Sequence, residues 1–317
     1  MNIPRTRNDL CLLCKKSKAS ATGSHIYTKF ITASMFGDKH NKQGGAINTA
    51  KFDYGNKAND TPKQDFLLCP NCENIRLGTL ETYISTFFYS RYKNEKFAGN
   101  FPIDKRFNII TGEVDCMILN GVHTGMFKLY MYSLVWRASI CTLSSFQNFK
   151  LNSYQEEILR GTLDNFLRID AKSTIDFYNA NFSTFPQFPF VVQTHLEQVD
   201  AGSNFVLEPW KIDASKFIIY LNEFIILFYM KWDSTRMFSP SYNPGNFPIN
   251  IALLNYQQWR GLIKSVIRKT VDAWLSNHKQ TLSIRKPNDW KQHTKLRLQV
   301  ESTNSIYFAM GVFLLFQ

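Results

Sequence analysis

The sequence predicts a mixed α+β fold. Three observations lead to this prediction. Two CxxC pairs lie within the first 98 residues, apolar residues recur with helical spacing between 73 and 168, and short apolar runs separated by turn residues fill 188–235. The first pattern is typical of a metal knuckle, the second of amphipathic helices and the third of antiparallel strands.

The composition narrows the class of protein. The 317-residue chain is 44% hydrophobic and 15% aromatic, which excludes wholesale disorder. Its formal net charge of +12 favours an anionic partner, with nucleic acid or an anionic membrane surface as candidates. No apolar run reaches about 18 uninterrupted residues, and the first residues lack a signal-peptide core. We therefore expect a cytoplasmic protein that does not enter a membrane.

The cysteines carry the most specific chemistry in the chain. A CxxC pair lets a tight knuckle direct two thiolates at one ion, and two pairs complete a tetrahedral zinc site. The predicted ligands of a structural Zn²⁺ are Cys11, Cys14, Cys69 and Cys72. A redox role would need a CxxC pair on a βαβ unit, which neither pair has. Cys116 and Cys141 lie among apolar residues and are expected to be buried small hydrophobes.

Helical spacing predicts three helices after the second knuckle, over about 73–92, 123–148 and 153–168. The first has Leu80, Ile84, Phe87 and Phe88 on one face. The second is apolar nearly all round, so we expect it to be central. It contains Arg137, whose guanidinium needs a buried partner or lines an internal site; the candidate partners are Asp115, Glu156 and Glu157. Ser153 with Glu156 predicts a capping box at the start of the third helix.

The remaining segments complete a two-part organisation. The zinc module is assigned to 1–98, and its polar stretch 39–63 reads as a long loop. A larger α+β region, 99–317, follows. It is expected to be helical over 99–187, a small antiparallel meander over 188–235, and helical and basic over 250–317, where a tryptophan-bearing amphipathic helix begins at residue 250.

Positive charge concentrates in two regions of the sequence. The first follows the first knuckle and comprises Lys15, Lys16, Lys18 and Lys29. The second lies on the late helix, where Arg260, Lys264 and Arg268 recur every four residues. An ordinary solvated face is the alternative for each patch. Together they predict a surface that follows the phosphates of a nucleic acid, most readily DNA.

The order of motifs in 8–92 resembles a known family. A CxxC pair, then "SHIYTKF", then "LLCPNCE" leading into a helix is similar to the zinc-bearing HNH-type endonucleases of the ββα-metal, treble-clef class. It is also similar to uncharacterised bacterial proteins with an HNH-like front end, some with an "SLVWRAS"-like helix. The resemblance implies a structural zinc on the four cysteines. It also implies that His25 is the general base and that the helix after the second pair presents a ligand to one Mg²⁺ or Mn²⁺.

The sequence departs from the family pattern around the expected cation. Ser24 stands where many active members have an acidic ligand, Gln64 where asparagine is expected, and Glu73 where asparagine is frequent. A rebuilt cation site would use Glu73 or Glu81, which lie two helical turns apart, so one of them would join His25. The structural alternatives are a strand histidine that packs within the zinc module, and a helix-capping role for Glu73.

Three functions are compatible with these observations. The first is a metal-dependent HNH-like DNA endonuclease, for which restriction or phage defence would be a natural role. The second is a catalytically inactive zinc-stabilised module that binds DNA or protein. The third is a scaffold whose basic faces bind an acidic partner or a membrane surface. A partner protein or a homo-oligomer fits each of them.

Overall fold

The computed structural model describes most of the chain up to residue 262. The described residues are 4–31, 44–47, 57–58, 61–108, 112–143, 146–147, 149–195, 205–207, 209–221, 223–232, 241–243, 245–255, 257–259 and 261–262. The predicted basic ridge of Arg260, Lys264 and Arg268 lies outside them, as do most of the expected loop 39–63 and the C-terminal segment.

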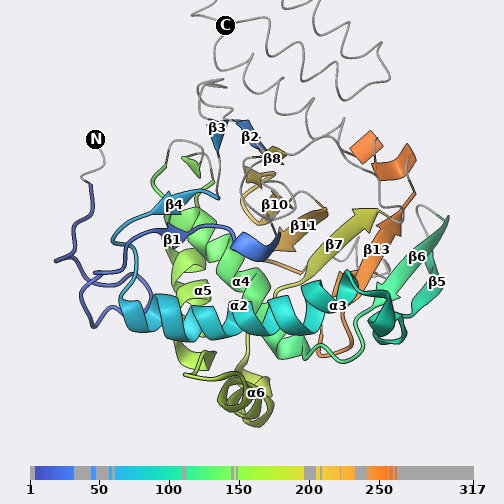
Figure 1. Ribbon diagram of the computed structural model, residues 1–317, viewed down its shortest axis with the longest axis horizontal. Coiled ribbons are helices and arrows are strands. Elements are labelled where there is room, and N and C mark those ends of the chain that lie inside the picture. Colours follow the sequence, from blue (N-terminus) through green and yellow to red (C-terminus); the bar gives the residue numbers. More distant parts are fainter. Residues whose placement is uncertain are drawn as a thin grey trace, which may run out of the picture.

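The N-terminal part combines two short paired strands with a long helical rod. Strand β1 (Ser24–His25) pairs antiparallel with β4 (Lys63–Gln64). The rod is continuous through four segments: η1 (Asn71–Leu77), α2 (Gly78–Ile84), η2 (Ser85–Tyr89) and α3 (Ser90–Tyr92). The segments η1 and η2 are π-helical, a wider turn than the α-helix. The helix predicted over 73–92 is confirmed, and Figure 1 shows the rod crossing the molecule in front of α4.

Three further α-helices follow in the described part of the chain. They are α4 (Thr124–Ile140), α5 (Ser153–Phe166) and α6 (Ala171–Ala180), with short 3₁₀ turns η3 (Glu95–Asn100) and η5 (Phe182–Thr184). Helix α4 is buried on nearly every side, as its apolar sequence predicted. The capping box of α5 lies one position earlier than predicted. Asn152 accepts a hydrogen bond from the Gln155 backbone N–H (2.9 Å), and the Gln155 side chain accepts one from the Asn152 N–H (3.1 Å).

The main sheet has eight strands in the order β5-β6-β13-β7-β11-β10-β9, with β12 paired to β7. Their bounds are β5 (Ile103–Asn108), β6 (Gly112–Ile118), β7 (Phe190–His195), β9 (Trp210–Lys211), β10 (Lys216–Leu221), β11 (Phe224–Tyr229), β12 (Tyr242–Asn243) and β13 (Asn250–Leu254). All pairings are antiparallel except that of β13 with β7. A second sheet joins β3 (Lys57–Ala58), β2 (Gly44–Ile47) and β8 (Phe205–Leu207).

The prediction of a small meander was therefore wrong in size. The hairpin β5–β6 lies in a region that was expected to be helical, and β13 occupies the residues where the late helix was expected to begin. Strand β13 lies between β6 and β7, and its Ile251, Ala252 and Leu253 are buried. A short apolar run of this kind fits a central strand and a buried helix equally well, so periodicity alone misassigned it.

One hydrophobic core connects the knuckles, the rod, α4 and the sheet. Phe127 of α4 illustrates the connection. Its ring lies 5.5 Å from that of Phe88 in η2 and 6.0 Å from that of Phe190 in β7, measured between centroids. In the part of the chain that the structure describes, no helix combines the length and the apolar character needed to cross a membrane.

Candidate metal centre and the polar clusters beside it

The four cysteines predicted to bind a metal come together at one point. The Sγ atoms of Cys11, Cys14, Cys69 and Cys72 all lie within 4.8 Å of one another. All four are free thiols, and the Sγ atoms of Cys14 and Cys69 are 4.0 Å apart. Three are buried and Cys14 is half-buried. Two knuckles that converge four sulfur donors on one point form a site suited to a structural metal ion such as zinc.

Backbone hydrogen bonds form each knuckle and join the two. In the first, the Cys11 N–H donates to the Ser17 carbonyl (2.8 Å), and Lys15 has a left-handed backbone with φ of 53°. In the second, the Glu73 N–H donates to the Cys69 carbonyl (3.0 Å). Two further bonds cross between them, from the Leu12 N–H to the Leu67 carbonyl (2.9 Å) and from the Ala21 N–H to the Leu68 carbonyl (3.0 Å). The site is therefore built by the backbone across a long sequence separation.

The crowding of the thiols couples their protonation. The hydrogen bond between Cys11 and Cys72 lowers the pKa of Cys11 to about 4 and raises the pKa of Cys72, while burial raises the pKa of Cys69. Cys11, Cys69 and Cys72 thus differ in how readily they give up a proton. A divalent cation favours the deprotonated form of these thiols, because thiolates are the form that binds it.

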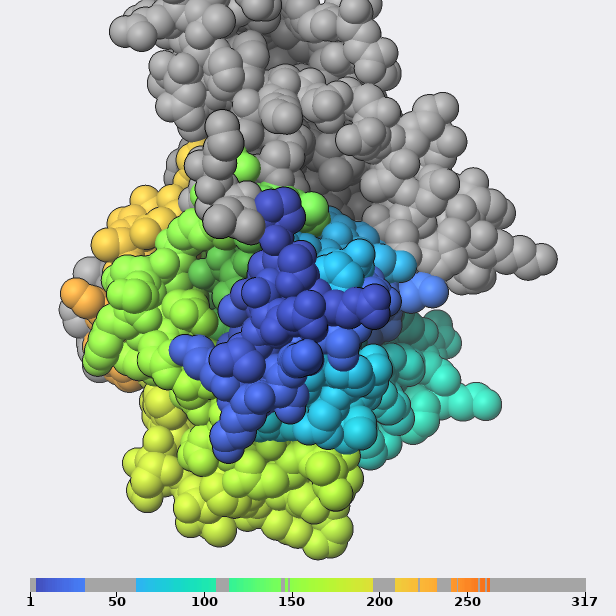
Figure 2. Space-filling view, turned by 90° about the vertical axis from the view of Figure 1, so that its left-hand side faces the viewer, coloured from blue at the N-terminus to red at the C-terminus, as the bar shows by residue number. Residues whose placement is uncertain are grey.

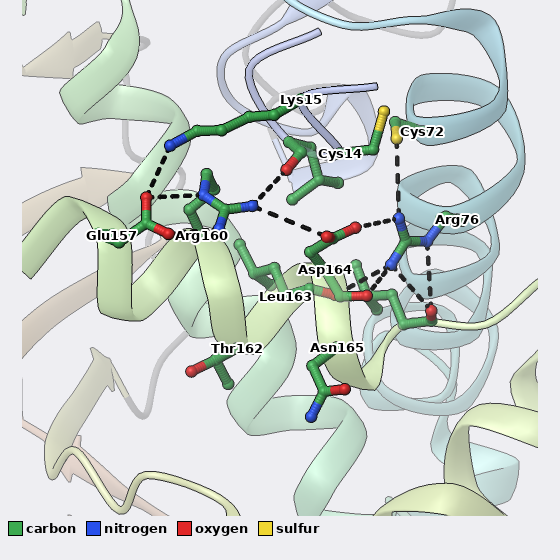
Figure 3. A network of polar contacts seen from close by, with 12 residues as sticks. Cys14, Lys15, Cys72, Arg76, Glu157, Arg160, Thr162, Leu163, Asp164 and Asn165 are labelled. Carbon is green, nitrogen blue, oxygen red and sulfur yellow. Dashed lines mark hydrogen bonds and ion pairs between the residues drawn. The ribbon is translucent and has the colours of Figure 1, made fainter. Parts of the chain in front are cut away.

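A chain of charged side chains connects the metal centre to α5 (Figure 3), and we call it the knuckle network. Its members are Lys15, Arg76, Glu157, Arg160 and Asp164. Arg76 is buried, and its Nη1 lies 3.8 Å from the Cys72 Sγ and 2.7 Å from the Asp164 Oδ1. Arg76 Nε also donates to the Leu167 carbonyl (3.2 Å).

The outer half of the knuckle network holds the first knuckle. Arg160 Nη1 donates to the carbonyl of Leu13, between the first two cysteines, at 2.7 Å. Glu157 accepts from Arg160 Nε (2.9 Å) and from Lys15 Nζ (2.7 Å). These hydrogen bonds, that of Arg160 first, lower the pKa of Glu157 to about 2. Helix α5 therefore contacts the first knuckle through Arg160 and the second through Asp164 and Arg76.

The same rod contributes Glu73 and Glu81 to a second polar cluster, which we call the His25 cluster. Its other members are His25 of β1 and Arg137 of α4. Arg137 reaches it from α4 with a side chain only 2% exposed. Its Nη1 donates to the Glu81 Oε1 (2.6 Å) and to the His25 carbonyl (3.0 Å). Burial raises the pKa of Glu73, and the neighbouring Arg137 charge opposes that rise.

The partner of Arg137 differs from the three that the sequence suggested. Asp115, Glu156 and Glu157 were the candidates, but the ion pair forms with Glu81. Glu156 instead accepts a hydrogen bond from the indole Nε1 of Trp136 (2.9 Å), the residue beside Arg137. Adjacent helix residues point in different directions, so the two side chains meet different partners.

The His25 cluster is closed rather than open. The His25 Nε2 is a buried atom, and Ser24 is 1% exposed. Within the described part of the chain, His25, Glu73 and Glu81 do not form a second group of ligand atoms as close as that of the cysteines. The guanidinium of Arg137 already places a positive charge beside the carboxylates. The Glu81 side chain is 26% exposed, so the arrangement matches a partly buried ion-pair cluster that joins β1 to the rod and α4.

The predicted basic residues of the first patch all lie on the surface. Lys15, Lys16, Lys18 and Lys29 are exposed. Lys15 is engaged with Glu157, and Lys18 Nζ reaches the Asn8 Oδ1 (3.3 Å). The sequence interpretation missed Arg76, Arg160 and Asp164, since charges at helical spacing look like a solvated face until the helix has a partner.

Comparison of the chain with protein-family models, with curated proteins and with solved structures finds no significant match. The arguments about function therefore rest on the site itself: a four-thiol metal centre, an exposed basic edge and a closed ion-pair cluster.

Proposed function

We propose that the chain is a nucleic-acid-binding protein whose N-terminal zinc module presents a basic edge to phosphates without hydrolysing them. The observation that carries the proposal is the position of Lys15, Lys16 and Lys18. They are exposed on the loop of the first knuckle, which backbone hydrogen bonds close next to the metal centre. Figure 2 shows this N-terminal segment on the surface of the molecule. Charges on a loop whose backbone is already hydrogen-bonded lose less conformational entropy when they bind phosphates.

The order of elements supports an HNH-like module as the platform. The first knuckle is followed by the paired strands β1 and β4, and the second knuckle opens directly into the helical rod. This is the order that the resemblance to zinc-bearing HNH-type modules implies. In such a module the zinc is structural and the strand–helix unit offers the ligand-binding surface.

The closed His25 cluster favours binding over hydrolysis. Cleavage of a phosphodiester needs an activated water near phosphorus and a cation on the developing charge. The buried His25 Nε2 does not meet a substrate in this conformation, and Arg137 holds Glu81 in an ion pair. The cluster instead joins β1, the rod and α4 through the contacts of Arg137.

The proposal is tested by fluorescence anisotropy with duplex and single-stranded oligonucleotides over a range of salt concentrations. We expect binding that weakens steeply with salt. The double variant Lys16→Gln/Lys18→Gln should bind more weakly, with a log–log salt slope reduced by about two, roughly one for each phosphate that is no longer neutralised. Lys96→Gln/Lys172→Gln, which removes two exposed charges elsewhere, is the matched control. Absence of binding at low salt contradicts the proposal.

A second candidate function is metal-dependent HNH-like DNA cleavage. A specific observation favours it: Arg137 contacts both the His25 carbonyl and the Glu81 carboxylate, and Glu73 lies near Arg137 and Glu81. His25 would act as base and one glutamate would hold Mg²⁺ or Mn²⁺ once Arg137 released it. A role in restriction or phage defence would follow from this activity.

Plasmid nicking separates the two candidates. Purified protein is incubated with supercoiled plasmid and Mg²⁺ or Mn²⁺, beside a His25→Ala variant. The binding proposal expects intact plasmid in both reactions. Metal-dependent nicking that disappears in His25→Ala would establish hydrolysis and overturn the non-catalytic part of the first proposal.

A further inference from the structure

A groove of about 790 Å³ lies beside the metal centre, between the first knuckle, the start of the rod, α5 and the beginning of α6. Its polar lining includes Lys16, Asn71, Arg76, Arg160, Arg168 and Ser173. Pockets of this size accommodate ligands as large as a nucleotide.

The groove has an excess of positive charge. Four cationic side chains line it, against the single carboxylate of Asp164. Arg76 and Arg160 share that carboxylate, at 2.7 Å and 3.7 Å. Lys16 and Arg168 form no ion pair with a carboxylate among the described residues. Among the described residues, two of the four cations that line the groove thus have no ion-pair partner.

Arg168 is held in place rather than left to solvent. Its guanidinium lies 3.6 Å from the centre of the Phe177 ring, and its Nη1 donates to the Leu167 carbonyl (3.2 Å). Burial and the nearby Arg76 charge lower its pKa. A partly buried guanidinium beside another guanidinium is unfavourable on its own, and an anion in the groove would relieve the repulsion.

We propose that this groove binds a phosphate monoester, either the terminal phosphate of a nucleic-acid strand or a free nucleotide. A monoester carries close to two negative charges at neutral pH, so it matches the charges of Lys16 and Arg168 better than a singly charged phosphodiester. Arginine suits such a ligand because its planar donors meet two phosphate oxygens at once. Asn71, Asn165 and Ser173 add polar groups for the attached sugar or base.

The metal centre positions much of this groove. Lys16 follows the first knuckle directly, Asn71 lies between the two cysteines of the second, and Arg76 contacts the Cys72 sulfur. For the strand-end ligand the proposal rests on the proposed nucleic-acid function, whereas binding of a free nucleotide does not.

The experiment measures binding of the full chain to four probes by calorimetry or anisotropy. The probes are AMP, inorganic phosphate, and one single-stranded oligonucleotide in 5′-phosphorylated and 5′-hydroxyl forms. We expect AMP to bind and the phosphorylated oligonucleotide to bind about tenfold more tightly than its hydroxyl counterpart. Lys16→Gln/Arg168→Gln should abolish both effects.

Two further variants separate binding from folding. Gly161 lines the groove, and a Cβ built there meets nothing within 4 Å, so Gly161→Leu should fold normally while its side chain occupies part of the groove beside Arg160 and Asp164. We expect it to abolish AMP binding with no change in charge. Lys96→Gln, on η3 and outside the groove lining, should bind like wild type.

Each outcome decides between the proposals. A phosphate-dependent gain that Gly161→Leu loses supports the groove and identifies a strand end as its ligand. Binding of AMP without binding of the oligonucleotides or of the duplex used above supports the groove and overturns the nucleic-acid function. Equal binding of both oligonucleotides without AMP or phosphate binding overturns the groove alone. Absence of binding by all four probes overturns the groove, and it overturns the nucleic-acid function as well when the duplex also fails to bind.

Discussion

The knuckle network and the His25 cluster both include residues of the same helical rod, but they differ in exposure and in the balance of their charges. Each uses one buried arginine to tie the rod to another helix. Arg76 reaches from the rod to Asp164 of α5, and Arg137 reaches from α4 to Glu81 of the rod. The knuckle network ends at the surface on Lys15 and borders a positively charged groove. In the His25 cluster the His25 Nε2 and one Glu73 carboxylate oxygen are buried, and the Glu81 side chain is 26% exposed.

The two clusters differ in their balance of positive and negative charge. In the His25 cluster a single guanidinium lies beside two carboxylates, so the cluster has no surplus positive charge to offer an anion. Around the knuckle network the cations outnumber the carboxylates, and the surplus faces solvent. The first arrangement stabilises a fold and the second attracts an anion. This difference is why we place binding at the knuckle side.

Breaking the metal centre should have the largest effect. Cys69→Ser removes one of four sulfur donors, so we expect sub-stoichiometric zinc by elemental analysis and a strong loss of thermal stability. Structural zinc in small domains contributes on the order of 10 kcal/mol. Cys141→Ala, a buried free cysteine outside the cluster, should keep one zinc per chain. Equal metal content in Cys69→Ser and wild type would refute the four-thiol centre.

Removing Arg137 should have the next largest effect. Arg137→Met leaves Glu81 and Glu73 without their buried cation, which we expect to lower the free energy of unfolding by about 3–5 kcal/mol in urea titrations. Arg137→Met/Glu81→Gln should lose less unfolding free energy than Arg137→Met alone, because it also removes the carboxylate charge that would be left without its cation. If the losses measured for Arg137→Met and Glu81→Gln simply add up in the double variant, the ion pair does not couple α4 to the rod.

Another buried cation, Lys128, provides a further test of how burial and charge affect stability. Lys128 of α4 is fully buried and hydrogen-bonds to the neutral Gln187, and burial lowers its pKa from 10.5 to about 8. Between these pH values the unfolded chain holds a proton that the folded chain releases, so wild-type stability should rise with pH across this interval. Lys128→Met should be more stable by about 1–3 kcal/mol below pH 8.

The measurement is urea unfolding of both proteins from pH 7 to 10.5. The advantage of Lys128→Met should shrink steadily as the pH rises, because the penalty of burying a charged amine disappears. Parallel pH profiles for the two proteins would contradict the assignment.

Weakening the knuckle network should have the smallest of these effects. Asp164→Asn removes the charge that Arg76 and Arg160 share, and we expect a loss of about 1–2 kcal/mol in unfolding free energy together with faster zinc transfer to a chelator. Asp176→Asn, which breaks the exposed pair with Lys172, is the control and should change stability by less than about 0.5 kcal/mol. An unchanged rate of zinc transfer would show that the network does not support the metal centre.

Local features were predictable from the sequence because their information is local. The spacing of Cys11 and Cys14, and of Cys69 and Cys72, defines two knuckles whose convergence the structure confirms. The rod and the buried α4 follow from helical spacing and from an apolar sequence on all sides. The exposure of the lysines beside the first knuckle agrees with the basic patch predicted from their clustering in the sequence.

Tertiary structure alone decided which charges meet and which short apolar runs pair as strands. Arg137 required a partner by its burial, but nothing local indicates Glu81, which lies 56 residues away. Strand β13 acquired its state from the neighbours β6 and β7 on either side. The sequence by itself thus determined the candidate metal ligands, the rod and α4, whose spacing is set within a few residues. The ion pairs, the eight-stranded sheet and the basic groove depend on contacts between segments that the chain keeps far apart.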